Sequence, residues 1–274
     1  MSESKDVLSE EVIRSLLKND NETVVLSEID STNEEIKRRV RDEKKKDFVI
    51  ISDMQTGGKG RRGRGFFSPA GTGIYMSILF CPDDKNASDL ILITTAAAVA
   101  VAHAIGEVCG KDAKIKWVND VYLDDRKICG ILTESVNDPE TGRIKYVICG
   151  IGINVKKPKE IPDDIKDIIG YIYDDTNDIN ASRNEIAAAV INQLQLYYDR
   201  LPDRSFLKEY KERSMVIGKS ISFGSPAKIA GVPDDDWEKA KAVDIDDEGG
   251  LVVECLDGSV RTLHTGEITL RLDS

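Results

Sequence analysis

Five glycines and four cations share nine consecutive positions of this chain, in the segment Gly57–Gly65 (GGKGRRGRG). Glycine lets backbone N–H groups come close to a ligand and adopts positive φ at little steric cost. Arginine and lysine place fixed positive charge beside those N–H groups. The combination predicts a cradle for an anion, either a phosphate or a carboxylate. A solvated basic loop that contacts nucleic acid is the alternative, and the loop by itself does not decide between the two.

The rest of the composition favours the small anion. The 274-residue chain carries a net charge of −11, whereas a general nucleic-acid-binding protein normally presents an extended basic face. Its 41% hydrophobic and 32% charged residues are typical of a soluble globular protein. The length is sufficient for one large domain and a smaller one.

The cysteines and histidines limit the chemistry. Five scattered cysteines with no C-x-x-C spacing, and a charged N-terminus without a signal peptide, predict reduced thiols in a cytoplasmic protein. Two histidines do not supply a His/Cys metal cluster or a nucleophile triad. The apolar run 90–108 contains Thr, His and Glu and is rich in alanine, so we expect a buried helix and no membrane span. Catalysis here would therefore rely on charge and positioning.

The chain divides into three parts by pattern. We expect a short N-terminal helical segment over 1–22, a main domain over 23–215 and a small β-barrel over 216–274. The barrel is predicted from five short strands in under sixty residues, with Asp257-Gly258 as a hairpin turn. The fold class is α/β (α+β), a mixed sheet flanked by helices. The helices are expected over 10–17, 31–43, 88–108, 182–199 and 203–213. The strands of the main domain are expected over 23–29, 48–52, 73–80, 114–117, 121–123, 127–135 and 145–151.

Standard nucleotide motifs do not fit. A Walker A site needs a hydroxyl residue after its lysine, and Gly60 follows Lys59. The segment Gly150-Ile151-Gly152-Ile153-Asn154 is expected to close a strand, but Val155 stands where a dinucleotide fold needs its third glycine. These two glycines indicate either close approach by a ligand or a tightly packed strand.

Two further segments each have a functional and a structural interpretation. Lys116-Trp117-Val118-Asn119-Asp120, with Lys127 on the next strand, could serve a nucleotide and its metal, or form a solvated hairpin. Ser31-Thr32-Asn33 opens a helix, and the spacings to Glu34 and Glu35 match a capping box. The same hydroxyls could hydrogen-bond a neutral polar ligand.

The order of these segments resembles the biotin protein ligase family. The resemblance is carried by Asp30–Asn33, Gln55–Arg64, Lys116–Asp120 with Lys127 and Gly130-Ile131-Leu132, and Gly150–Asn154. The stretch from Gly249-Gly250-Leu251 to Gly266-Glu267-Ile268 is similar to that family's small C-terminal domain, so the resemblance covers residues 23 to 272. Three positions depart from it: Lys59 for the usual Arg, Val118 for Pro and Phe66 for Trp. The segment before Thr23 is too short for the winged helix of relatives that are also repressors, so no DNA partner is expected.

The resemblance implies a two-step reaction. Biotin and ATP form biotinyl-5′-AMP and pyrophosphate, and biotin then passes to a lysine of the biotin carboxyl carrier domain of a carboxylase. It implies Lys127 and Arg61 as catalytic residues, with ATP and Mg²⁺ required and Asp120 as a metal candidate through Mg-ATP. The biotin site would comprise Ser31, Thr32, Asn33, Gln55, Gly58, Lys59, Arg61, Lys127, Gly150 and Gly152. The nucleotide site would comprise Arg61, Arg62, Arg64, Phe66, Lys116, Asn119, Asp120 and Asn154.

Three questions stay open from the sequence. A lipoate or octanoate ligase has a similar fold and also activates a carboxylate, and a non-catalytic sensor would use the same pocket for biotin or the adenylate. The arginine-rich loop and the C-terminal domain favour biotin, and the retained cations favour catalysis. Whether the protein is a homodimer is not indicated.

Overall fold

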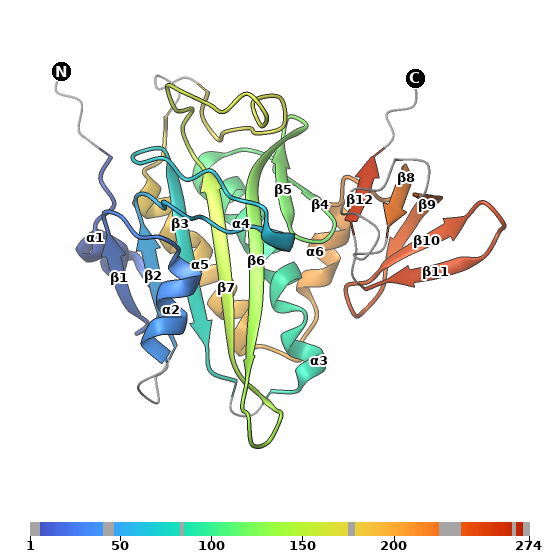
Figure 1. Ribbon diagram of the computed structural model, residues 1–274, viewed down its shortest axis with the longest axis horizontal. Helices are drawn as coiled ribbons and strands as arrows, with labels where there is room; N and C mark the ends of the chain where they lie inside the picture. Colours follow the sequence, from blue (N-terminus) through green and yellow to red (C-terminus); the bar gives the residue numbers. More distant parts are fainter. Residues whose placement is uncertain are drawn as a thin grey trace.

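The computed structural model describes residues 6–40, 47–82, 85–174, 179–224, 237–264 and 267–270 and contains two sheets (Figure 1). The larger sheet has seven strands in the order β1-β2-β3-β7-β6-β5-β4. Their bounds are β1 Glu22–Leu26, β2 Phe48–Ser52, β3 Gly73–Phe80, β4 Lys114–Lys116, β5 Asp120–Leu123, β6 Arg126–Asn137 and β7 Ile144–Asn154. β1 and β2 are parallel and the other neighbours are antiparallel, so the predicted mixed sheet is confirmed.

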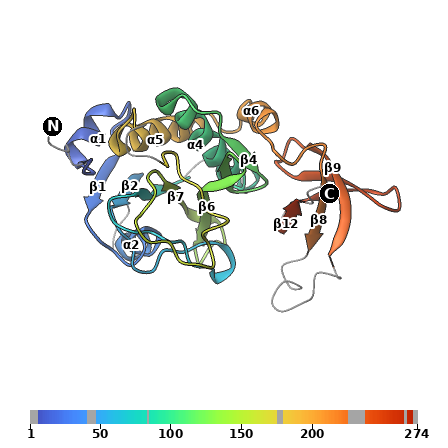
Figure 2. The same ribbon diagram turned by 90° about the horizontal axis from the view of Figure 1, so that it is seen from above.

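Helices cover both faces of this sheet (Figure 2). α1, α4 and α5 lie over one face, and α2 lies over the other. This is why β2 and β3 read as continuous apolar runs: every residue of both strands is buried. The helix bounds are α1 Glu10–Leu16, α2 Thr32–Val40, α3 Ala87–Leu90, α4 Ile93–Cys109, α5 Arg183–Asp199 and α6 Phe206–Glu212.

The apolar segment Ala87–Cys109 is long and hydrophobic enough to pass for a membrane helix, but 67% of its most apolar window is buried inside the protein. Its main part, α4, packs against α5, α6 and the sheet. It ends at Gly110, whose φ of 68° suits the left-handed C-cap position. The prediction of a buried helix is confirmed, with a break between α3 and α4 that the pattern did not reveal.

Two predicted boundaries are wrong, and a third is not tested. β7 continues to Asn154, so Gly150 and Gly152 lie within the strand and do not close it. α6 begins at Phe206, and just before it the Asp203 carboxylate accepts hydrogen bonds from the N–H and the hydroxyl of Ser205. α2 ends at Val40 within the described residues, and the predicted extension over 41–43 lies outside them.

The second sheet is antiparallel, with five strands in the order β11-β10-β9-β8-β12. A separate C-terminal antiparallel sheet is therefore confirmed, but among the described residues β11 and β12 are its edges and do not pair, so closure into the predicted β-barrel is not observed. The bounds are β8 Ser220–Gly224, β9 Glu238–Ile245, β10 Leu251–Cys255, β11 Val260–Leu263 and β12 Glu267–Leu270. Gly266 and residues 271–272, which the sequence pattern included, lie outside the described residues.

The turn between β9 and β10 connects this sheet to the main domain. The Trp117 indole Nε1 donates to the Gly249 carbonyl at 3.0 Å, and Arg204 Nη1 donates to the Asp247 carbonyl at 2.8 Å. A Cβ on Gly249 would meet Leu92 and Thr95 of the main domain at 3.2 and 3.3 Å. The β9–β10 turn of the second sheet therefore packs against Trp117 and the start of α4.

Candidate active site

A cavity of about 420 Å³ lies on the face of the large sheet that carries α2. Its walls come from the start of α2, the loop after β2, the β4–β5 turn, and strands β6 and β7. The sequence-predicted residues that line it are Ser31, Thr32, Asn33, Gln55, Lys59, Arg61, Arg64, Phe66, Lys116, Asn119, Asp120, Lys127, Gly150 and Gly152. Segments that lie more than a hundred residues apart in the chain therefore meet at one place.

Three other predicted residues lie beside this wall. Gly58 is packed under the loop, where an added Cβ would collide with the Phe66 carbonyl and lie 2.7 Å from the Ser68 hydroxyl. Arg62 is exposed at the loop tip with a φ of 59°. The Asn154 side chain is buried and its Nδ2 lies 3.5 Å from the Lys127 carbonyl. We infer no direct ligand contact from these three placements.

Glycines form the floor of the cavity. Gly130 of β6 pairs with Gly152 of β7, and Gly150 lies two residues further along the same strand. A Cβ on Gly152 would run into the Phe66 ring, and one on Gly150 would collide with the Asn33 carboxamide. A Cβ on Gly130 would lie 3.1 Å from the Phe66 ring. The missing side chains are what let Phe66 and Asn33 lie directly on the sheet.

A hydrogen-bonded polar group occupies the α2 end of the cavity. The Thr32 N–H donates to Gln55 Oε1 at 2.9 Å, and the Ser77 hydroxyl lies 2.7 Å from the Thr32 hydroxyl. Ser77 also lies 2.5 Å from Asn33 Oδ1, and Asn33 Nδ2 donates to Glu134 at 2.8 Å. These partners fix the side chains that face the cavity, so their remaining donors and acceptors are held in place for a neutral polar ligand.

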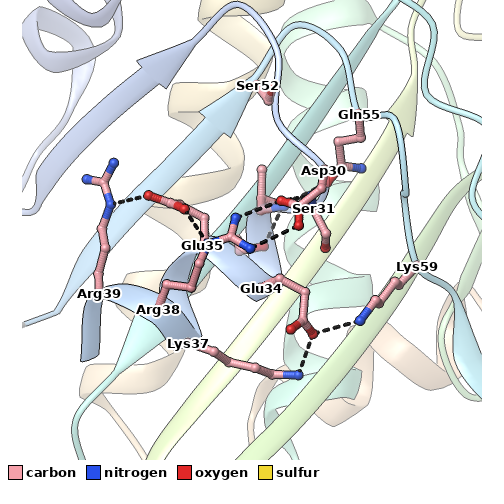
Figure 3. Close-up of polar contacts among 12 residues, drawn as sticks. Asp30, Ser31, Glu34, Glu35, Lys37, Arg38, Arg39, Ser52, Gln55 and Lys59 are labelled. Atoms are coloured by element: carbon pink, nitrogen blue, oxygen red, sulfur yellow. Dashed lines mark hydrogen bonds and ion pairs between the residues drawn. The ribbon is translucent and has the colours of Figure 1, made fainter. Parts of the chain in front are cut away.

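The predicted capping boxes are wrong. The N–H groups of Ser31 and Thr32 donate to the Asp30 carboxylate and the Gln55 amide, respectively. Glu34 and Glu35 form ion pairs with lysines and arginines, as Figure 3 shows. Tertiary partners therefore satisfy the helix start, which local spacing could not reveal.

The glycine loop, Gly57–Gly65, is folded back on itself. Gly60 N–H donates to the Arg64 carbonyl at 2.8 Å, and Phe66 N–H donates to the Gly58 carbonyl at 2.9 Å. Between them the chain turns through Arg61–Gly63, where Gly63 has a φ of 72°. This turn directs Arg61 toward the β4–β5 turn, where its Nη1 donates to Asn119 Oδ1 at 2.9 Å.

Lys127 projects into the cavity from the strand opposite the glycine loop. Its Nζ lies 2.6 Å from Asp120 Oδ1, and the two side chains are only 28% and 22% exposed. Its backbone is held as well, because Lys127 N–H donates to the Ile168 carbonyl and Gly170 N–H donates to the Lys127 carbonyl. The ion pair with Asp120 therefore holds the Lys127 ammonium, and the two backbone hydrogen bonds hold the part of the strand from which the side chain projects.

Sequence reasoning missed several lining residues. Gly130 and Trp117 were part of the motifs that carried the resemblance but were not assigned to the site. Trp237 and Ile268 come from the C-terminal sheet and complete the cavity from outside the main domain. Trp237 directly follows three aspartates in the sequence, where a large aromatic residue is unexpected. That position could have indicated that Trp237 belongs to a binding site.

The donor set near Lys127 suits a metal that arrives with its ligand. Among the described residues no group of three or more His, Cys, Asp or Glu is placed to hold a metal ion. Asp120 offers a carboxylate, which forms an ion pair with Lys127. Asn119 offers an amide oxygen, which accepts a hydrogen bond from Arg61. Mg²⁺ is commonly bound by one or two carboxylates together with phosphate oxygens and waters. The residues therefore fit Mg²⁺ carried by a nucleotide.

The polar group at one end of the cavity and the cations at the other suit a small ligand with a polar head and an anionic tail. Comparison with known proteins agrees with this. Residues 25–154 match the biotin/lipoate A/B protein ligase family, and residues 223–271 match the biotin protein ligase C terminal domain. The chain is 31% identical over 247 residues to the bifunctional ligase/repressor BirA of Escherichia coli, a match that covers 90% of this chain and 73% of that one.

Two further comparisons support the same assignment. BirA of Bacillus subtilis is 32% identical over 226 residues, and the match spans 81% of this chain but 66% of the length of that relative. The structure of biotin protein ligase from Aquifex aeolicus in complex with biotin and ATP superimposes with a TM-score of 0.72 at 26% identity, covering 92% of this chain and 99% of that one. The chain belongs to the biotin protein ligase family.

Proposed function

We propose that this chain activates biotin with ATP to biotinyl-5′-AMP and transfers the biotin to one lysine of the carrier domain of a biotin-dependent carboxylase. The observation that carries the proposal is the cavity itself, where a fixed polar group and a set of cations stand over a glycine floor. The family membership supports the same reaction, and the Aquifex aeolicus relative is described in complex with biotin and ATP.

The first step brings together a carboxylate and a triphosphate, which repel each other. Lys127 is the principal catalytic residue: its ammonium stands where negative charge develops between the carboxylate and the α-phosphate, and Arg61 assists from the glycine loop. Preorganised charge of this kind acts without reorganisation at the moment of reaction and is worth several kcal/mol. Asp120 holds the Lys127 ammonium in place at 2.6 Å.

The α2 end binds the uncharged head of biotin. Ser31, Thr32 and Gln55 donate and accept hydrogen bonds at the ureido ring. Asn33, which lies against Gly150, provides a further polar group at this end of the cavity. Because Gly150 and Gly152 carry no side chain, Asn33 and the Phe66 ring lie flat against the sheet and leave room for the ligand above them. Gly58 lets the glycine loop pack closely over this end, and Lys59 adds positive charge at its margin.

The nucleotide lies between the glycine loop and the β4–β5 turn. Arg62, Arg64 and Lys116 are cations near this end, and Phe66 supplies an apolar surface beside the floor. Asn119 and Asp120 orient the phosphates together with Mg²⁺, which neutralises part of their charge when bound. Asn154 supports the start of β6, because its side-chain amide donates to the Lys127 carbonyl.

The second step needs a partner of defined chemistry, an exposed lysine on a carrier domain. Its amine attacks the mixed anhydride and AMP leaves, so the protein itself supplies no nucleophile. All five cysteines are free thiols. They suit a reducing compartment, which supports a cytoplasmic location for the reaction.

The test is incubation with labelled biotin, Mg-ATP and a carboxylase carrier domain. We expect label on one lysine of the carrier, and none on a carrier in which that lysine is replaced by arginine. Binding of biotin without label transfer would identify a sensor. Preferential transfer of lipoate or octanoate under the same conditions would identify a ligase for those acids, and either result would overturn the proposal.

A further inference from the structure

The glycine loop is attached to both walls of the cavity. On one side Arg61 Nη1 donates to Asn119 of the β4–β5 turn at 2.9 Å. On the other side Lys59 Nζ lies 2.8 Å from Glu34 Oε1, in the first turn of α2 (Figure 3). Lys59 pairs across the loop with Gly65, so a restraint on Lys59 acts on both arms of the loop.

Glu34 is itself held by a series of ion pairs. Lys37 Nζ lies 2.8 Å from Glu34 Oε1 and 2.8 Å from Glu134 Oε1. Glu134 in turn accepts from Asn33 at the cavity floor. A continuous path of polar contacts therefore runs from Lys59 in the glycine loop to Asn33, which lies against Gly150.

The charge on Glu34 is stabilised where it stands. Hydrogen bonds from Lys37 and Lys59 lower the pKa of its carboxyl to about 2, and a carboxylate in the first turn of a helix is favoured by the helix dipole. The Lys59 side chain is 50% exposed and that of Glu34 is 29% exposed. A single ion pair of this exposure is a weak interaction, so its loss should loosen the loop while changing the stability of the fold only slightly.

We propose that Glu34 is a positioning residue, which holds the glycine loop over the cavity through Lys59 and so lowers the concentration of biotin needed for half-maximal activity. Lys59 acts in this chain as the link between the loop and the helix. The kinetic part of this inference rests on the proposed function, whereas the structural part does not.

The test is a double-mutant cycle on ligand-free protein, with Glu34→Gln, Lys59→Met and both together. The measurement is hydrogen exchange of the loop amides of Gly60 and Phe66, whose hydrogen bonds close the loop. Each single variant should raise the exchange rate about three-fold, and the double variant should show about the same rise, because both remove one interaction. Lys59→Arg should keep the slow exchange, since arginine can rebuild the pair.

Glu35→Gln is the matched control. Glu35 lies next to Glu34 on the same helix but pairs with Arg38 and Arg39, so its loss should leave loop exchange unchanged. In steady-state assays the biotin KM should rise about three-fold in Glu34→Gln with kcat unchanged. Unchanged loop exchange in Glu34→Gln, or single effects that add in the double variant, would overturn the proposal. These exchange results are obtained without substrate, so they stand whether or not carrier labelling succeeds.

Discussion

The two sides of the cavity are built in opposite ways. The floor, Gly130, Gly150 and Gly152, is uncharged and lies inside two long paired strands, where strand register fixes every position. The cationic rim, Arg61, Arg64 and Lys127, projects from a loop and a strand end, and two of its side chains are held by polar partners, Arg61 by Asn119 and Lys127 by Asp120. The floor can select a ligand by shape, and the rim can activate it by charge.

This difference predicts different consequences of mutation. Changes to the floor should alter which ligand fits and how tightly it binds. Changes to the rim should alter the rate of the chemical step, because charge placed at the transition state affects kcat. Changes to the support beneath the loop should affect the whole protein. The following variants separate these cases, from the largest expected effect to the smallest.

Arg183 supports both ends of the segment that carries the glycine loop. It is 2% exposed, pairs with Asp53 after β2, and donates to the Gly73 carbonyl at the start of β3. Arg183→Met would remove a buried guanidinium that pairs with Asp53 and Asp6 and donates to the Gly73 carbonyl, so we expect the free energy of unfolding to fall by about 3 kcal/mol. Urea unfolding measures it, and replacement of the exposed Arg200 at the C-cap of the same helix, Arg200→Met, should change it by less than about 0.5 kcal/mol. Equal values for the two variants would contradict this role.

Lys127→Met tests the rim. We expect the single-turnover rate of biotinyl-5′-AMP formation to fall about 100- to 1000-fold, because a charge placed at the transition state is lost. The melting temperature should stay close to that of the unaltered protein. Lys145→Met is the control, since Lys145 is exposed on β7 over the Tyr146 ring and away from the cavity. A rate within a few-fold of normal would exclude Lys127 as the principal cation.

Gly152→Ala tests the floor. The new methyl group would collide with the Phe66 ring and force it toward the ligand. Overpacking of this kind costs about 1–3 kcal/mol, so the biotin KM should rise about ten-fold or more while kcat changes less. The control is Gly106→Ala on α4, where the nearest atoms would be 3.7 Å away. A normal KM in Gly152→Ala would show that the floor does not determine fit.

The pH dependence of the loop contact gives the smallest expected effect. The pKa of Glu34 is lowered from 4.5 to about 2 by Lys37 and Lys59, so its contribution is present above pH 4.5 and is lost as the pH falls toward 2. The stability difference between the unaltered protein and Glu34→Gln should therefore be about 1 kcal/mol or less at pH 6 and should shrink by pH 3. Chemical unfolding at both pH values measures it. A difference that grows on acidification would contradict the assigned ion pairs.

The strands of the core were predictable because their pattern is local. The expected ranges 48–52 and 73–80 agree with β2 and β3 to the residue, since both are apolar runs bounded by polar or turn-forming residues. The expected ranges 121–123 and 127–135 are also separated by a turn in the structure, where Asp124 and Asp125 adopt positive φ. By contrast, glycine is unfavourable inside a strand, so the sequence predicts that the strand expected from residue 145 ends at residue 151. In the structure β7 continues to Asn154, because it pairs with β3 on one side and with β6 on the other.

Much of the site was recognisable from motif order, but its supports were not. Ser77, Glu134 and Arg183 lie in strands or a helix whose local pattern only indicates burial or amphipathicity. Their importance follows from contacts with residues 44 to 130 positions away in the chain. Trp237 and Ile268 were missed for the same reason, since the packing of the two sheets brings them to the cavity.

The central claim is that this cavity joins biotin's carboxylate to the α-phosphate of ATP. The most direct measurement is exchange of labelled pyrophosphate into ATP, with purified protein and Mg²⁺, in the presence and absence of biotin. The account predicts exchange that depends on biotin and requires no carrier protein. Exchange that is absent with biotin, or equally fast without it, would contradict the claim.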